Sequence, residues 1–263
     1  MSTVVFFHAH PDDETLLTGG TMALLADQGH RVVLVTATNG EAGLSAGNAA
    51  LGARRVIELT HAAQLLGCAA VEPLGFPDSG SGPAPIPGSF ATLNVDEPAQ
   101  RLAGILERER ADVLTGYDPA GGYGHRDHVQ VHRVARAAAA IARPRALMEV
   151  TADRRALQRA LRITQLQRWY GADFATSRFD QLYTSHHMIT HRIDVSAFAA
   201  QKRAAMRAHH SQATGPQETR TLEIFEQLPA PVFRAIFRRE WYVQVGTTPG
   251  RRPVRTFLAD IRT

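Results

Sequence analysis

TVVFFHAHPDDETLLTGGTMALLADQGHRVVLVTA, residues 3–37, contains two apolar runs separated by a segment with helical character. The runs TVVFF (3–7) and RVVLVTA (31–37) are rich in β-branched and aromatic residues. Continuous runs of this kind are typical of strands that are buried on both faces, as in a parallel sheet. Because the segment between them, TLLTGGTMALLADQGH, favours a helix, the stretch predicts a strand–helix–strand unit.

The same alternation continues to about residue 150. Further strands are expected at 69–74, 111–117 and 145–150, and further helices at 50–67, 96–110 and 129–142. Residues 75–95 are rich in Pro, Gly and Ser and are predicted to form a long loop of the kind that often carries function. The alternation predicts an α/β fold with a Rossmann-like, doubly wound, mostly parallel sheet over residues 1–150.

Beyond residue 150 the pattern is weaker. It predicts a helical segment at 153–170, a strand at 186–195, a second helix at 196–210 and a late strand at 241–245. No internal repeat and no low-complexity linker separates these elements from the core. We therefore expect a single domain over residues 1–263, in which residues 151–263 form a variable C-terminal elaboration.

The composition excludes several classes of protein. The net charge of +4 comes almost entirely from scattered arginines, and aromatic residues make up 7% of the chain, so nucleic-acid binding is not expected. Solvated surface arginines are the expected explanation of the charge, and attraction of anionic small substrates is the alternative. No apolar run is long enough for a transmembrane helix, so no membrane partner is expected. With one cysteine and no recognisable secretory signal, the expected location is the cytoplasm.

Two polar clusters follow predicted strands, HAHPDDE at 8–14 and GHRDH at 124–128. Ligands of parallel α/β sheets bind outside the carboxyl ends of the strands, so both clusters are expected at one site. A catalytic zinc ion needs three protein ligands and one open position, and His10, Asp13 and His128 are the expected set. Such an ion lowers the pKa of bound water to about 7 and so produces a nucleophile.

The residues beside these ligands predict hydrolysis. Asp12 is expected to be the general base that takes a proton from the water, and His125 to stabilise the oxyanion of the intermediate. Asp127 is expected to orient His125 and keep it protonated. Tyr123, on the same glycine-rich loop, is a second candidate donor.

Four other residues have plainer interpretations. His8 is expected to pack or to support the ligands, His132 to lie on a helix face, and Cys68 to be a packed core thiol. Glu14 is either a helix-start carboxylate stabilised by the helix dipole or a support for the ligands.

These motifs resemble the PIG-L/LmbE-type zinc-dependent N-acetylglucosaminyl deacetylases, which include the mycothiol and bacillithiol pathway deacetylases. The two polar clusters carry the resemblance. Weaker support comes from TNGEAG (38–43), RVIEL with the following LLG (55–67), GFPDSG (75–80) and KRAAMRAHHSQ (202–212). The family also has a Rossmann-like sheet with a variable C-terminal part. One departure is Arg126, where many relatives carry Pro, which should loosen the loop without removing either histidine.

The resemblance implies the same metal ligands, base and oxyanion histidine. It also implies that Arg55 and Asp78 contact the sugar-linked part of the substrate, that His125 can donate to the leaving amine, and that Tyr123 can help to polarise the amide carbonyl. The expected substrate is an N-acetylated aminosugar conjugate of the N-acetylglucosamine type.

Three alternatives stay open. An amidase that cleaves a thiol-sugar conjugate would use the same metal site, and a non-catalytic binding protein would keep the fold alone. A dinucleotide-dependent oxidoreductase is disfavoured, because carboxylates stand where a pyrophosphate would bind. Imidazole and carboxylate ligands suit Zn²⁺ and also Fe²⁺, and the sequence does not indicate the oligomeric state.

Overall fold

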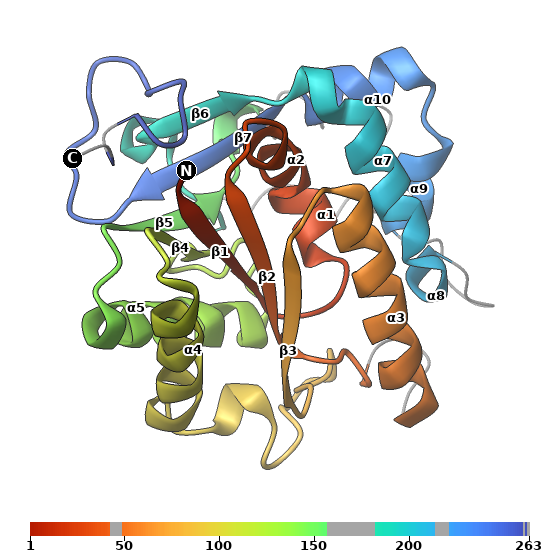
Figure 1. Ribbon diagram of the computed structural model, residues 1–263. Helices are drawn as coiled ribbons and strands as arrows, with labels where there is room; N and C mark the ends of the chain where they lie inside the picture. The colour runs from red at the N-terminus through yellow and green to blue at the C-terminus, as the bar shows by residue number, and fades with distance from the viewer. Residues whose placement is uncertain (43–48, 157–181, 214–220, 260, 262–263) are drawn as a thin grey trace.

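In the computed structural model, which describes residues 1–42, 49–156, 182–213, 221–259 and 261, the strands form one seven-stranded sheet (Figure 1). Its order is β3-β2-β1-β4-β5-β7-β6. The first five strands are parallel, and β7 is antiparallel to both of its neighbours. The strands are β1 Thr3–His8, β2 Arg31–Thr38, β3 Ala70–Phe76, β4 Val113–Tyr117, β5 Ala146–Thr151, β6 His191–Asp194 and β7 Arg239–Gln244. The predicted α/β fold with a mostly parallel sheet is confirmed.

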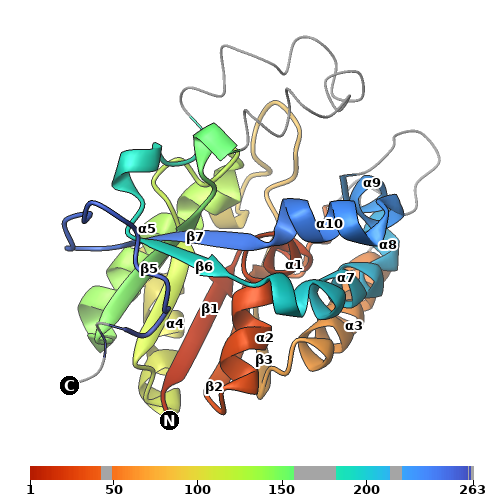
Figure 2. The same cartoon turned by 90° about the horizontal axis from the view of Figure 1, so that it is seen from above.

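Helices cover both faces of the sheet. Figures 1 and 2 show α4 and α5 on one face, and α1, α2, α3 and α7 on the other. The α-helices are α1 Asp13–Leu17, α2 Gly19–Asp27, α3 Ala49–Leu65, α4 Asp96–Glu109, α5 Arg126–Ala142, α7 Ala199–Ala208, α8 His210–Ala213, α9 Thr221–Gln227 and α10 Ala230–Phe237. Short 3₁₀ turns are η1 Phe90–Thr92, η4 His186–Met188 and η5 Ser196–Phe198.

The core follows from the apolar strands. Every residue of β1 from Val4 to His8 is buried, and so is every residue of β2 from Val32 to Thr38. Such strands need helices on both faces, which is the arrangement observed. Pro73 lies within β3, where the missing N–H is tolerated because β3 is at the edge of the sheet.

Several element boundaries differ from the expected ones. The helix expected at 15–30 is divided at Thr18, which has φ −133° and ψ −5° and whose hydroxyl lies 2.8 Å from His8 Nε2. Helix α5 begins at Arg126 rather than 129, because the His125 side chain caps its first turn. The strand expected at 186–195 is confined to His191–Asp194. Most of the helix expected at 153–170 lies outside the described residues.

The C-terminal part is joined to the first helices by a buried cluster of charges. Glu240 of β7 accepts hydrogen bonds from the backbone N–H groups of Gly20 and Thr21, both at 2.8 Å, in the first turn of α2. Lys202 of α7 lies 2.6 Å from Glu240 Oε1 and donates to the Leu16 carbonyl at 2.9 Å. Because charge-assisted hydrogen bonds of this kind are strong, they connect the two halves of the chain.

The strand order reverses at the centre of the sheet. From β1 the chain proceeds outward to β2 and β3, and then returns to β4 on the other side of β1. At such a switch point the loops leave the carboxyl ends of neighbouring strands in opposite directions and open a crevice. The two polar clusters follow β1 and β4, so the fold places both there.

Candidate active site

The two polar clusters meet at the crevice. The ring of His10, from the loop after β1, lies 5.6 Å from the ring of His128 and 4.8 Å from the ring of His125, measured between centroids. His125 and His128 stand at the beginning of α5. Residues more than a hundred positions apart in the sequence therefore form one cluster.

Asp13 lies between two of these imidazoles. One carboxylate oxygen is 3.3 Å from His10 Nδ1 and the other is 3.2 Å from His128 Nε2. The backbone N–H of His10 donates to the same carboxylate at 2.9 Å, which fixes its orientation. A tetrahedral zinc site with bonds of about 2.0 to 2.2 Å places its ligand atoms about 3.3 to 3.6 Å apart. Each of the two contacts has nearly that spacing, but they involve different oxygens of Asp13, and within the described residues the expected set is not one of the triplets whose ligand atoms lie within 4.8 Å of one another.

The donor groups fit a metal ion. Among the described residues, two triplets bring ligand atoms within 4.8 Å of one another: His10 with His125 and His128, and His10 with Asp78 and Asp127. Both ring nitrogens of His128 are buried, and within the described part of the chain Nε2 has only the contact with Asp13 at 3.2 Å. Buried polar atoms are rarely left without a partner, and a cation bound at one of these nitrogens would satisfy that nitrogen.

His10 is surrounded by carboxylates. Its Nε2 lies 3.0 Å from Asp127 Oδ2 and 3.6 Å from Asp78 Oδ1, in addition to the contact with Asp13. Burial lowers the pKa of His10, but the hydrogen bonds to Asp127 and Asp13 outweigh it and leave this pKa well above the usual value. The same surroundings attract a divalent cation.

Asp12 has an unusual backbone conformation. Its φ of 114° and ψ of −30° lie in a region that side-chain-bearing residues rarely adopt. Its side chain is 21% exposed and its Oδ1 lies 3.3 Å from Arg55 Nη2. Burial raises the pKa of Asp12 to about 6, with Arg55 acting in the opposite direction. Asp12 is therefore mostly ionised at neutral pH and partly open to the site.

Arg55 and Asp78, the expected substrate contacts, both face the protein. Arg55 is 3% exposed and donates to the carbonyls of Gly40, at 2.8 Å, and Pro11. Asp78 is 6% exposed and accepts from the Gly80 N–H at 2.8 Å. Their contact with a sugar stays a prediction, whereas their contacts in the structure support the loop that carries Asp12 and the ring of His10.

The expected arrangement of Asp127 is wrong. Its carboxylate contacts His10 and accepts hydrogen bonds from the hydroxyl and the N–H of Ser79, the latter at 3.1 Å. Only its backbone N–H reaches His125, where it donates to Nδ1 at 3.2 Å. This bond leaves the proton of a neutral imidazole on Nε2. Burial and the nearby His10 and His128 lower the pKa of His125 to about 4, so this histidine is neutral rather than protonated.

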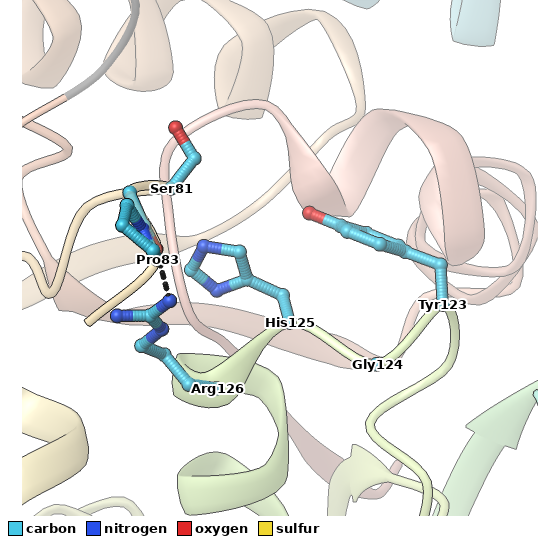
Figure 3. A pocket seen from close by; sticks show the side chains of 7 residues that line it. Ser81, Pro83, Tyr123, Gly124, His125 and Arg126 are labelled. Atoms are coloured by element: carbon cyan, nitrogen blue, oxygen red, sulfur yellow. Dashed lines mark hydrogen bonds between the residues drawn. The ribbon is translucent and has the colours of Figure 1, made fainter. Parts of the chain in front are cut away.

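A cavity opens beside His125. It has a volume of about 370 Å³ and is lined by Ser81, Gly82, Pro83, Tyr123, Gly124, His125 and Arg126. In Figure 3 the rings of His125 and Tyr123 face the same space, and Arg126 reaches toward the Gly82 carbonyl. Tyr123 is 48% exposed and its ring centroid is 4.8 Å from that of His128. A small polar ligand in this cavity would contact Tyr123 and His125 together.

The plainer expectations about neighbouring residues are confirmed. Both ring nitrogens of buried His8 contact protein hydroxyls, Tyr117 at 2.9 Å and Thr18 at 2.8 Å. His132 lies on α5 with its Nδ1 3.0 Å from the Tyr117 carbonyl oxygen. Cys68 packs against the hydrophobic core, and burial raises the pKa of its thiol.

The sequence did not point to three further residues that support the site. Tyr117 stacks on His128 with ring centroids 4.3 Å apart, and Ser79 holds Asp127. His209 forms an ion pair with Glu14 at 2.6 Å. Both interpretations of Glu14 are confirmed, because it lies in the first turn of α1 and also supports its neighbours from a fully buried position. The only sequence signal for His209 was the weak motif KRAAMRAHHSQ.

None of the described helices combines the length and apolar character that crossing a membrane requires.

Comparison with known proteins gives concordant results. The sequence model of the PIG-L family, described as GlcNAc-PI de-N-acetylase, matches residues 5–139. Two curated relatives are named 1D-myo-inositol 2-acetamido-2-deoxy-alpha-D-glucopyranoside deacetylase. The protein of Thermobifida fusca is 37% identical over 80% of this chain and 82% of its own length. That of Mycobacterium sp. (strain KMS) is 36% identical over 98% of this chain and 88% of its own length.

Solved structures show the same fold at lower identity. The N,N'-diacetylchitobiose deacetylase of Pyrococcus horikoshii has a TM-score of 0.58 and 21% identity, over 93% of this chain and 84% of that one. GalB, the 4-carboxy-2-hydroxymuconate hydratase of Pseudomonas putida KT2440, has a TM-score of 0.59 and 17% identity, over 97% and 100%. Because a hydratase shares the fold, the fold alone does not identify the reaction.

Proposed function

Because the chain belongs to the PIG-L family, we propose that it is a metal-dependent hydrolase that removes the acetyl group from an N-acetylglucosamine conjugate. The observation that carries the proposal is the position of Asp13 between His10 and His128, with Asp12 beside it. Three ligands and an adjacent carboxylate are the minimum that metal-assisted amide hydrolysis requires.

We assign the metal to His10, Asp13 and His128. Zn²⁺ suits this set, and Fe²⁺ is the second candidate, since imidazole and carboxylate bind both. When bound, such an ion supplies Lewis acidity and lowers the pKa of a water molecule. The His128 ring supports this assignment, because its buried Nε2 has no partner in the described chain other than the Asp13 carboxylate. Two other triplets of ligand atoms compete with this set, and variants of the ligands distinguish them.

Asp12 is the base in this proposal. Its carboxylate is half-buried, and its pKa of about 6 leaves it ionised but able to accept a proton at neutral pH. Arg55, at 3.3 Å, favours the ionised form and holds the carboxylate in place. The proton that Asp12 accepts from the attacking water is then available for the leaving amine.

His125 is the donor to the amide oxygen. Its Nδ1 accepts from the backbone of Asp127, so its Nε2–H is free to donate toward the developing negative charge. Tyr123, on the rim of the same cavity, supplies its hydroxyl as a second donor. Asp127 acts indirectly, by holding the ring of His10 and the loop at Ser79.

For the substrate we propose an N-acetylglucosaminide joined to a small polar group such as an inositol. The support is the name of the two relatives and the cavity of about 370 Å³ beside His125. We further propose a cytoplasmic enzyme of small-molecule metabolism, with all 263 residues in one domain.

The test is acetate release by the purified protein from N-acetylglucosaminyl-inositol, together with metal analysis. Asp12→Asn should lower kcat by at least about 100-fold, as expected for loss of a general base, while the metal content is unchanged. Asp27→Asn, the same substitution at an exposed position at the end of α2, is the control. Equal rates for Asp12→Asn and the wild type would exclude Asp12 as the base.

The acyl group is tested in the same assay. Conjugates with acetyl and with larger acyl groups are compared by kcat/KM. Faster release of the larger group would favour the thiol-sugar amidase over the deacetylase. No release of either group by the metal-loaded protein would contradict the proposed function.

A further inference from the structure

One buried ion pair connects the C-terminal part to the candidate base. His209 Nε2 lies 2.6 Å from Glu14 Oε1, and both side chains are fully buried. The second carboxylate oxygen of Glu14 accepts a hydrogen bond from the backbone N–H of Asp12 at 2.9 Å. Residue 209 is thus linked to residue 12 through a single side chain.

Asp12 needs support of this kind. A residue with a side chain at φ 114° is strained, and such conformations persist only where several contacts enforce them. Its carbonyl accepts from the N–H and the hydroxyl of Thr15, at 3.1 and 2.8 Å. Its carboxylate faces Arg55. The bond from the amide of Asp12 to Glu14 completes the set, so its loss would free the peptide to rotate.

The position of His209 is itself fixed by the fold. It ends α7 in a non-helical conformation, with φ −86° and ψ 53°, which directs the chain into α8. Two residues later, Ser211 donates its hydroxyl and its N–H to Glu58 of α3, at 2.6 and 3.0 Å. These bonds anchor the segment that follows α7 to α3, and they involve neither Glu14 nor Asp12.

We propose that His209 is a positioning residue for deacetylation, which holds Glu14 so that Asp12 keeps its strained backbone and the aim of its carboxylate. The inference rests on the proposed function, in which Asp12 is the base. It assigns to the C-terminal part a role in the reaction, although no residue of that part belongs to the candidate metal-ligand triplets found in the described chain.

Two substitutions of His209 separate positioning from packing. His209→Gln keeps an N–H donor close to the place of Nε2, whereas His209→Leu removes it. We expect His209→Leu to lower kcat by about 10- to 100-fold, the cost of a misplaced catalytic group, with KM and bound metal unchanged. His209→Gln should recover most of this loss, to within about threefold of the wild type, because the hydrogen bond to Glu14 is retained.

Ser211→Ala is the matched control. It removes the hydroxyl contact of the same segment to Glu58 but does not touch Glu14 or Asp12. It should lower the melting temperature while kcat stays within about twofold of the wild type, because the hydrogen bonds of Glu14 to His209 and to the Asp12 amide are left in place. An equal loss of kcat in Ser211→Ala and His209→Leu would overturn the proposal, since general loosening would then explain both.

Glu14→Gln removes the other partner of the ion pair. If His209→Leu does not fold, this variant tests whether the pair positions Asp12. It removes the charge that His209 binds, so kcat should fall while the metal is retained. Wild-type kcat in the folded variant at either position would overturn the role of His209. Full activity of Asp12→Asn would instead overturn the proposed function, and the inference with it.

Discussion

The two loops that build the site are held in different ways. In the loop after β1, His10 and Asp12 are fixed by buried contacts to Asp13, Glu14 and Arg55. The loop after β4, residues 118–125, instead contains three glycines with φ between 65° and 90°. It is anchored at its beginning by Asp118, which accepts from the Gly122 N–H at 2.9 Å, and it exposes nearly half of Tyr123.

The difference indicates a division of tasks. Groups that must keep one geometry, two proposed metal ligands and the base, come from the loop with buried support. The groups that we propose to meet the substrate, Tyr123 and His125, come from the loop whose glycines permit other conformations. His128 belongs with the first set, because it stands in α5 and not in the loop itself.

The most severe test of the comparison is loss of a ligand from the first loop. Asp13→Ala should lower metal affinity by more than about 100-fold, the upper range for residues that only support a ligand, and activity should be lost with it. Metal content after dialysis, measured beside a Tyr123→Ala control, checks the prediction. Retention of the metal by Asp13→Ala would place the ion in one of the other triplets.

The next largest effect concerns the joint between the second loop and α5. A Cβ at Gly121 would lie 2.7 Å from the Val129 nitrogen and 2.9 Å from His128 Cβ. Gly121→Ala should therefore displace His128 and lower kcat/KM by about 10-fold or more. Gly122→Ala has the same φ of 65°, but its Cβ would meet only the Tyr183 ring, at 3.3 Å. Equal activities of the two variants would show that backbone strain, not the approach to His128, is what matters.

A third prediction concerns the pH dependence given by the first loop. Burial raises the pKa of Asp12 and the positive charge of Arg55 lowers it, and together they leave this pKa at about 6. Removing that charge in Arg55→Met should raise the pKa of Asp12, because the carboxylate loses its partner. Since the base must be unprotonated, the acidic limb of kcat/KM should move to higher pH. A pH profile that stays in place or moves to lower pH would contradict the assignment.

The smallest effect is expected at the exposed end of the second loop. Tyr123→Phe removes one hydroxyl at the rim of the cavity, so kcat/KM should fall by about 5- to 10-fold, as for loss of one hydrogen bond to a reacting group. Melting temperature and metal content should not change, because Tyr123 is 48% exposed. A loss of stability would mean that the hydroxyl makes a hydrogen bond within the protein rather than one to the substrate.

The fold was predictable from the sequence because its signals are local. The apolar runs of β1 and β2 indicate buried parallel strands, and the rule that ligands bind at strand ends brings His10 and His128 together. The contacts of Asp127 and the pairing of Glu14 with His209 were not predictable. They depend on side-chain directions and on elements that lie 48 and 195 positions away. The helix expected at 196–210 did place His209 at the end of a helix, but no signal in the sequence indicated that its ring would meet Glu14.

The bonds of Glu240 to the first turn of α2 have a consequence for synthesis. Thr21 leaves the ribosome 219 residues before its partner on β7, which at about 5 to 20 residues per second is a wait of about 10 to 45 s. During that time the N-terminal strands can pair, but the amides at the start of α2 have no acceptor from β7. We therefore expect the nascent protein to stay inactive, and open to proteolysis near Thr18, until its last strand has been translated.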